Sequence, residues 1–266
     1  MRLPVKSFMV GALLASGAMS APALADDKKD DSVIPGDLTG TLSLTTDYTF
    51  RGISQTDSGP AIQGTFDYAY MFRDEIGVYA GIFGSNVDFD ETSGPGVNKA
   101  SAEFDFYGGV KGTIRSITWQ LGYIYYAYPG AHPSSNFDYD YQEIVVKLGH
   151  DFDFMAITAG VNYSWDYFSE TGTGVYWNAD VSVPLRFLPL ETKALAHIGR
   201  QTIDDNARFG APDYTDWMLG LSTTYKGFTL TAAYVDTDIS KGECFPGTGL
   251  TNTCKARGVL TISKSF

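Results

Sequence analysis

Eleven charged side chains occupy one alternating phase of segments that are otherwise rich in aliphatic and aromatic residues. They are Asp47, Arg51, Asp67, Glu103, Asp105, Lys111, Glu143, Lys147, Asp180, Lys193 and Asp216. Residues two apart in a strand point to the same side, so these groups would share one face of a sheet. Charges on a water-filled wall set which ions approach it, and seven acids against four bases would favour cations weakly. The alternative is that these groups pair across neighbouring strands, because an unpaired charge in a narrow interior is costly.

Arg51 and Asp47 lie close together near the end of the first segment. They would either constrict the interior as a charged pair or form a structural ion pair. We favour the structural pair.

Three histidines are the remaining groups suited to acid–base chemistry near neutral pH. His132 lies beside a proline, His150 in a short turn, and His197 in a segment next to the one that carries Asp180. The chain has neither the G-x-S-x-G of serine hydrolases nor the H-E-x-x-H of zinc proteases. We therefore expect no enzyme, no catalytic residue, no metal site and no cofactor.

The two cysteines, Cys244 and Cys254, lie close together in a segment that contains Gly, Thr and Pro. In an oxidising compartment this spacing predicts a disulfide that staples a loop. A metal site would require more ligands at short spacing, and no histidine is near.

Strands must position these groups, because apolar side chains recur at every second position along twelve segments. In the first segment, Leu42, Leu44, Tyr48 and Phe50 share one phase. Short turns and longer polar loops mostly alternate between segments. No acidic residue interrupts the middle of the apolar phase, and its aromatic residues crowd toward segment ends, as in an interfacial girdle. A soluble β-sandwich also alternates, but it has no reason to band its aromatics.

These patterns predict an all-β fold, a closed antiparallel up-and-down transmembrane β-barrel of 12 strands. Its apolar phase would face lipid and its charged phase the interior, and closure would satisfy every edge hydrogen bond.

The N-terminus predicts export. Arg2 and Lys6 precede an uncharged apolar run, and a small-x-small cleavage site ends at Ala25. We expect residues 1–25 to be a signal peptide, 26–37 a mobile periplasmic leader and 38–266 a single barrel in the outer membrane of a Gram-negative bacterium. No other segment approaches the roughly 20 apolar residues of a membrane helix.

The net charge of the chain and its C-terminal residue indicate which partners to expect. The net charge of −12 becomes −14 once Arg2 and Lys6 leave with the signal peptide. An acidic surface argues against nucleic acid as a partner. The expected partners are outer-membrane lipid, small solutes and, through the terminal Phe266, the barrel-assembly machinery. Lys264 departs from the usual apolar pattern of such a final strand.

The stretch LTTDYTFRGISQTDSGPAIQGTFDYAY, followed by VYAGIFGSNVDF, EFDFYGGVKG and GYIYYAYPG, resembles the TorF-type porin family. The resemblance is dense from Thr41 to Gly130 and thinner beyond. It implies an outer-membrane barrel and a pore, and it supplies no substrate.

We therefore expect a porin that allows passive diffusion of small hydrophilic solutes or ions, with a weak preference for cations. The alternative is a binding or adhesion barrel that acts through its outer loops, with Asp236 to Ala256 as the natural binding loop. A barrel hydrolase is the third possibility.

Overall fold

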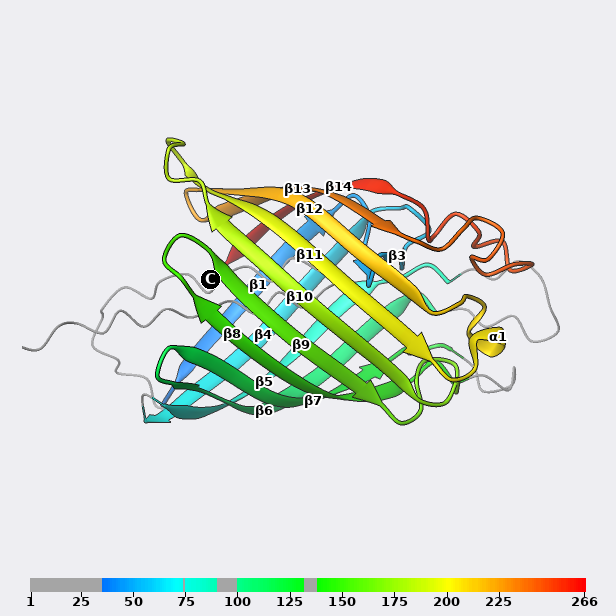
Figure 1. The fold of residues 1–266 in the computed structure, drawn as a ribbon, viewed down its shortest axis with the longest axis horizontal. Helices are drawn as coiled ribbons and strands as arrows, with labels where there is room; N and C mark the ends of the chain where they lie inside the picture. The colour runs from blue at the N-terminus through cyan, green and yellow to red at the C-terminus, as the bar shows by residue number, and fades with distance from the viewer. Residues whose placement is uncertain (1–34, 74, 90–99, 132–137) are drawn as a thin grey trace, which may run out of the picture.

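The computed structural model describes residues 35–73, 75–89, 100–131 and 138–266. The expected signal peptide, most of the leader and His132 lie outside this range. Within it, twelve long strands form one closed antiparallel barrel, as predicted (Figure 1). In order they are β1 (Asp37–Thr45), β4 (Ala61–Arg73), β5 (Ile76–Asn86), β6 (Ala102–Ile114), β7 (Ile117–Ala127), β8 (Tyr141–Asp151), β9 (Ala156–Ser164), β10 (Gly174–Pro184), β11 (Glu191–Ile203), β12 (Tyr214–Tyr225), β13 (Phe228–Thr237) and β14 (Arg257–Ser265).

Each strand pairs with its neighbours along the chain, and β1 pairs with β14 to close the barrel. The connections after β1, β5, β7, β9, β11 and β13 are the longer ones, and they gather at one end, which we call the loop end. The opposite turn end carries short connections such as Lys226–Gly227, where both residues have positive φ, 51° and 77°. That geometry suits a two-residue hairpin, and this tight turn was expected from the sequence.

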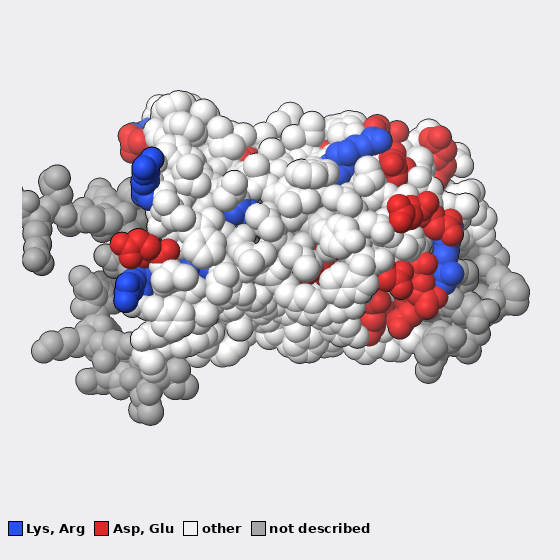
Figure 2. Space-filling model, turned by 60° about the horizontal axis from the view of Figure 1, so that its bottom comes forward, with Lys and Arg blue, Asp and Glu red and all other residues white. Residues whose placement is uncertain are grey.

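The two phases of the strands point in opposite directions, as predicted. Leu42, Phe66 and Leu219 are 53%, 53% and 61% exposed on the outside. Exposed aromatic residues lie near both ends of the strands, such as Trp177 toward the loop end and Phe228 at the turn end. In the view of Figure 2, charged atoms gather at the two ends, and the band between them is almost free of them.

No helix of the described residues is long and apolar enough to span a membrane. The loop between β11 and β12 contains a single short helical turn, α1 (Asn206–Phe209).

The first predicted segment is shorter than expected, because β1 ends at Thr45, whose Oγ1 donates to the carbonyl of Asp47 at 2.9 Å. The following loop turns inward and forms a small hairpin of β2 (Thr49–Phe50) and β3 (Ile53–Ser54) inside the barrel (Figure 1). The assignment of Tyr48 and Phe50 to the lipid-facing row is therefore wrong. Tyr48 is 2% exposed, and Phe50 packs edge-on against the inward-facing Tyr126.

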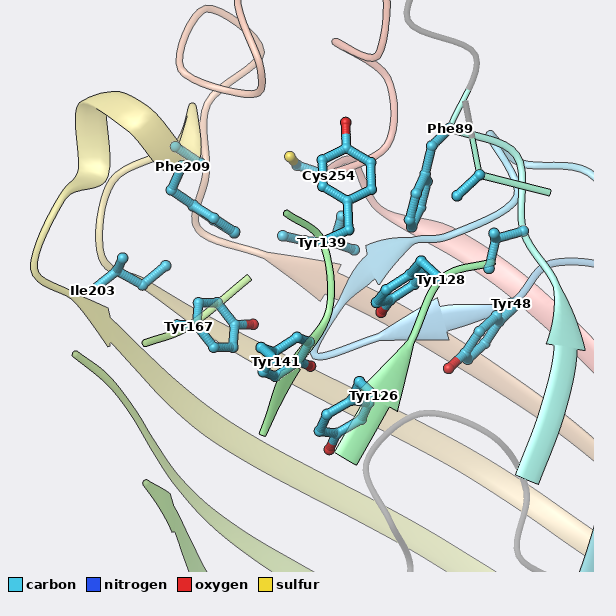
Figure 3. Packing of buried hydrophobic residues seen from close by; sticks show 14 of the residues in the cluster. Tyr48, Phe89, Tyr126, Tyr128, Tyr139, Tyr141, Tyr167, Ile203, Phe209 and Cys254 are labelled. Atoms are coloured by element: carbon cyan, nitrogen blue, oxygen red, sulfur yellow. The ribbon is translucent and has the colours of Figure 1, made fainter. Parts of the chain in front are cut away.

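Buried aromatic residues fill the interior beside this hairpin at the loop end (Figure 3). We call this set the aromatic core, and it comprises Tyr48, Phe89, Tyr126, Tyr128, Tyr139, Tyr141, Tyr167, Phe209 and Tyr214. Tyr126 and Tyr141 stack with ring centroids 4.2 Å apart, and Tyr141 meets Tyr167 edge-on at 4.9 Å. The core of this barrel thus lies within its lumen and toward one end.

Candidate functional site

The structure places all eleven predicted charged residues inside the barrel or at its rim. Eight of them are buried: Asp47, Arg51, Glu103, Asp105, Glu143, Lys147, Asp180 and Asp216. Asp67 and Lys111 are half-buried in the interior toward the turn end, and Lys193 is exposed at the turn-end rim. The buried eight gather toward the loop end, around the inward hairpin.

Arg51 and Gly52 form the two-residue tip of this hairpin. Both have positive φ, 48° and 80°, which matches the twist of a tight hairpin and favours glycine at the second position. A Cβ at Gly52 would lie 2.5 Å from Thr237 Cγ2 and 2.7 Å from Asp216 Cβ. The tip is therefore pressed against β12 and β13, with no room for a side chain at position 52.

Arg51 makes the central contact of the site. Its Nη2 donates to both carboxylate oxygens of Glu143 at 2.7 Å, and its Nη1 donates to Gln201 Oε1 at 2.7 Å. Glu143 belongs to β8 and Gln201 to β11, so one side chain joins two distant parts of the wall. A guanidinium bonded in this way to a carboxylate is among the strongest polar contacts in proteins.

Three aromatic rings surround the same guanidinium. Arg51 Cζ lies 4.7 Å from the ring centroid of Phe50, 4.3 Å from that of Tyr176 and 5.7 Å from that of Tyr167. Desolvation by burial lowers the pKa of Arg51, but Glu143 raises it, and the net shift is upward, so the guanidinium stays charged. Cation–π attraction adds to the ion pair where water is excluded.

The Glu143 carboxylate is fully bonded. Besides the arginine, it accepts a hydrogen bond from Asn162 Nδ2 at 2.8 Å and one from the Tyr126 hydroxyl at 3.1 Å. A buried ion pair is tolerated when its remaining lone pairs are satisfied. This condition is met here.

Glu103 and Asp105 differ from Glu143 in their hydrogen-bond and charge partners. The Tyr48 hydroxyl donates to Glu103 Oε1 at 2.6 Å, which ties the base of the hairpin to β6. Asp105 Oδ1, on the same face of β6, is buried without a hydrogen-bond partner. Neither carboxylate has a salt bridge to a basic side chain in the described chain.

The expectation that Asp47 and Arg51 pair with each other is wrong. Asp47 Oδ2 accepts from Arg257 Nη1 at 2.5 Å, and its Oδ1 accepts from Ser54 Oγ at 2.6 Å. Arg257 also donates to the carbonyl of Thr253. Because the tip of the hairpin reaches into the lumen while Asp47 stays at its base, the two charges meet different partners.

His197 lies beside Asp180, as the sequence indicated. Its Nδ1 is 2.7 Å from Asp180 Oδ1, and its Nε2 is 3.1 Å from Asp216 Oδ1. The Tyr176 hydroxyl is 2.8 Å from the same Nε2 and donates to Asp216 at 3.0 Å. These described partners include no serine, threonine or cysteine. The four side chains thus form one buried hydrogen-bonded cluster.

Cys244 and Cys254 form the predicted disulfide. The carbonyl of Cys254 accepts from Thr237 Oγ1 at 2.7 Å, and the adjacent carbonyl of Thr253 accepts from the amide of Ser54 at 2.9 Å. The stapled loop thus rests on the inward hairpin. No group of three or more His, Cys, Asp or Glu side chains that could hold a metal occurs among the described residues.

Several central residues of the site were not predicted from the sequence. They are Tyr48, Tyr126, Asn162, Tyr167, Tyr176, Gln201 and Arg257. One available signal was the occurrence of large tyrosines in the polar phase near the loop ends of β7, β8, β10 and β12. The other was the Arg-Gly pair between Phe50 and Ile53, which is typical of a tight hairpin.

Residues 29–266 match the family described as "Bacterial protein of unknown function (Gcw_chp)". The chain belongs to this family. No curated protein matches its sequence. The family match does not confirm the TorF-type name, which stays an expectation from resemblance.

Solved structures similar to this Gcw_chp chain are porins and other barrels. The NanC porin aligns with a TM-score of 0.52 and 10% identity, over 86% of this chain and 99% of that one. The KdgM porin in complex with disordered oligogalacturonate aligns with a TM-score of 0.46 and 6% identity, over 86% of this chain and 98% of that one. A Pseudomonas aeruginosa FadL homologue aligns with a TM-score of 0.48 and 11% identity, over 88% of this chain and 76% of that one. At such identities the NanC likeness shows the fold alone, and the two lower scores carry no argument.

Proposed function

We propose that this chain is an outer-membrane porin that lets small hydrophilic solutes or ions diffuse passively. The observation that carries this proposal is the opposite polarity of the two faces of a closed barrel. Apolar rows point outward along its strands, and charged and hydroxyl side chains point inward. Lipid satisfies the first face, and closure leaves no strand edge unpaired within a bilayer.

The interior charges support a weak preference for cations. Arg51, Arg257 and His197 are each engaged by at least one buried carboxylate. Glu103 and Asp105 have no such basic partner in the described chain, and carboxylates outnumber basic side chains in the buried set. Rings and clusters of acidic side chains favour cation entry.

Reconstitution tests both parts of the proposal. In planar bilayers, the purified barrel should give discrete conductance steps, and in a salt gradient the reversal potential should have the cation-selective sign. Closed bilayers together with saturable ligand binding, lost on trimming the stapled loop, would instead indicate an adhesion barrel. Turnover of phospholipid or peptide would indicate a hydrolase.

The proposed location also rests on export and assembly. Fractionation should place the mature chain, beginning near Asp26, in the outer membrane. Phe266 exchanges two backbone hydrogen bonds with Gly40, and this aromatic residue is 77% exposed at the turn end. Such a ring is available to the barrel-assembly machinery, so deleting Phe266 should leave more unassembled chain in the periplasm.

A further inference from the structure

The inward hairpin touches the barrel wall on nearly every side. Tyr48 reaches Glu103 on β6, and Arg51 reaches Glu143 on β8 and Gln201 on β11. Gly52 presses on β12 and β13. Contacts with strands so far apart around a closed barrel are possible only if the hairpin crosses the lumen.

Asp47 completes this set of contacts through its ion pair with Arg257 at the start of β14. The base of the hairpin is thus held on the wall beside β1, and its tip is held on the far wall.

The packing around the hairpin leaves almost no surface for water at this level. Arg51 is 3% exposed, and the facing Glu143, Tyr176 and Gln201 are 1%, 1% and 0% exposed. Side chains that lined a continuous water-filled channel would be accessible. The hairpin and the aromatic core together therefore occlude the loop half of the lumen.

The turn half of the lumen is different. Many inward-facing residues there are only half-buried, including Thr65, Tyr79, Lys111, Gln120, Ser222 and Thr231. Water therefore reaches these side chains from the turn end. A short segment separates an accessible half from an occluded one.

Non-covalent bonds hold this hairpin in place. Its two strands contribute only two residue pairs of their own, Thr49 with Ser54 and Phe50 with Ile53. Its far end depends on one guanidinium that binds a carboxylate, an amide oxygen and three rings. Such a segment can leave the lumen without disturbing the barrel ladder, since β1 and β4 pair with each other along their whole facing length.

We propose that the first loop, residues 46–60, is the gate of this barrel and that Arg51 is the latch that holds it closed. The proposal rests on the proposed pore function. Opening would break the contacts of Arg51 with Glu143 and Gln201 and carry the tip toward the loop end, where water solvates the guanidinium. The aromatic rings would lose their central cation and separate more easily.

The test combines two independent readouts on the full-length barrel. Conductance is recorded in planar bilayers for the natural protein, for Arg51→Met and for Arg186→Met. Arg186 is a matched control, because it forms an exposed ion pair with Asp153 at the turn end.

Movement of the hairpin is measured separately by adding Ile53→Cys to each of these proteins. Ile53 is 6% exposed, and a cysteine introduced there can be labelled with a membrane-impermeant maleimide once the hairpin moves. The native cysteines are disulfide-bonded and do not react.

We expect Arg51→Met to raise both the open probability and the labelling rate of the introduced cysteine by about tenfold or more, because it leaves Glu143 buried without its counter-charge. Arg186→Met should change neither readout. Arg51→Met combined with Glu143→Met should restore much of the closure, since an apolar pair suits the aromatic surroundings. Heat-modifiable mobility on gels shows that each variant has folded.

The outcomes separate the gate from the pore. Equal conductance and equal labelling in the natural protein and in Arg51→Met would overturn the latch and leave the pore standing. Continued protection of the introduced cysteine in a folded Arg51→Met variant would overturn the latch as well. Faster labelling without any conductance would show that the hairpin moves, and it would overturn the pore function and with it the gate.

Discussion

Arg51 Nη2 lies 2.7 Å from both carboxylate oxygens of Glu143, although 92 positions separate these residues in sequence. Their side chains are 2% and 1% exposed. This pair orients the first loop across the lumen, and Asn162, Gln201 and Tyr126 complete its hydrogen bonds. Changes to this contact and to its surroundings should therefore alter both the stability of the barrel and the position of the loop.

Replacing each of two buried glutamates by glutamine should change the stability of the barrel differently. Glu143→Gln removes the counter-charge of Arg51 and should lower the free energy of unfolding by about 3–5 kcal/mol. Glu103→Gln keeps an oxygen for Tyr48 and gives Asp105 a donor, so it should be neutral or stabilising by about 1 kcal/mol. Urea unfolding of the reconstituted barrel measures both. Equal losses in the two variants would contradict this assignment of partners.

Gly52 should be the least tolerant glycine of the hairpin. Gly52→Ala meets Thr237 and Asp216 at the tip in addition to the strain of a positive φ. Gly227→Ala is the control, because it has a similar φ of 77° and nothing within 4 Å of its Cβ. Strain alone costs about 1 kcal/mol at either site. In the Ile53→Cys background, only Gly52→Ala should raise maleimide labelling, and equal labelling in both variants would argue against a seated tip.

The disulfide should stabilise its own loop more than the barrel. Replacing Cys244 and Cys254 by serine removes a constraint worth about 2–3 kcal/mol for a loop of this length. The β13–β14 ladder persists without it. Limited proteolysis should therefore cut within residues 245–253, while the barrel's melting temperature stays within a few degrees. A collapse of the melting temperature would show that the staple supports the barrel itself.

His197 should act as a structural residue. Its two nitrogens lie against Asp180 and Asp216, so His197→Ala leaves two carboxylates short of a partner. We expect a loss of about 3 kcal/mol in the free energy of unfolding. Lipase and protease assays should show no activity for the natural protein to lose. Turnover that disappears in His197→Ala would support the hydrolase alternative.

The alternation of apolar and polar residues was sufficient to predict the strands and their two faces. A period of two is a local property, and turns such as Lys226–Gly227 have their own chemistry. The same periodicity was misleading at Tyr48 and Phe50, because the alternation continues across the point where the chain leaves the wall. The inward turn depends on Glu103 and Tyr126, which lie far along the sequence.

The sequence indicated that interior charges could pair, but it did not indicate which residues would be partners. Composition indicated that interior charges would either line a pore or pair, and salt bridges join several of them. The partner of Arg51 follows from barrel closure and from the inward course of the first loop, and no local pattern encodes either. The role of Arg257 was not predicted, because this residue begins the last strand and pairs with Asp47 near the other end of the sequence.

Single-channel recording in a salt gradient tests the central claim most directly. The barrel should show long closed periods and brief discrete openings, with a reversal potential of the cation-selective sign, and Arg51→Met should lengthen the openings. Bilayers that stay silent with both folded proteins would contradict the claim, since neither a latch nor a pore would then explain the hairpin across the lumen.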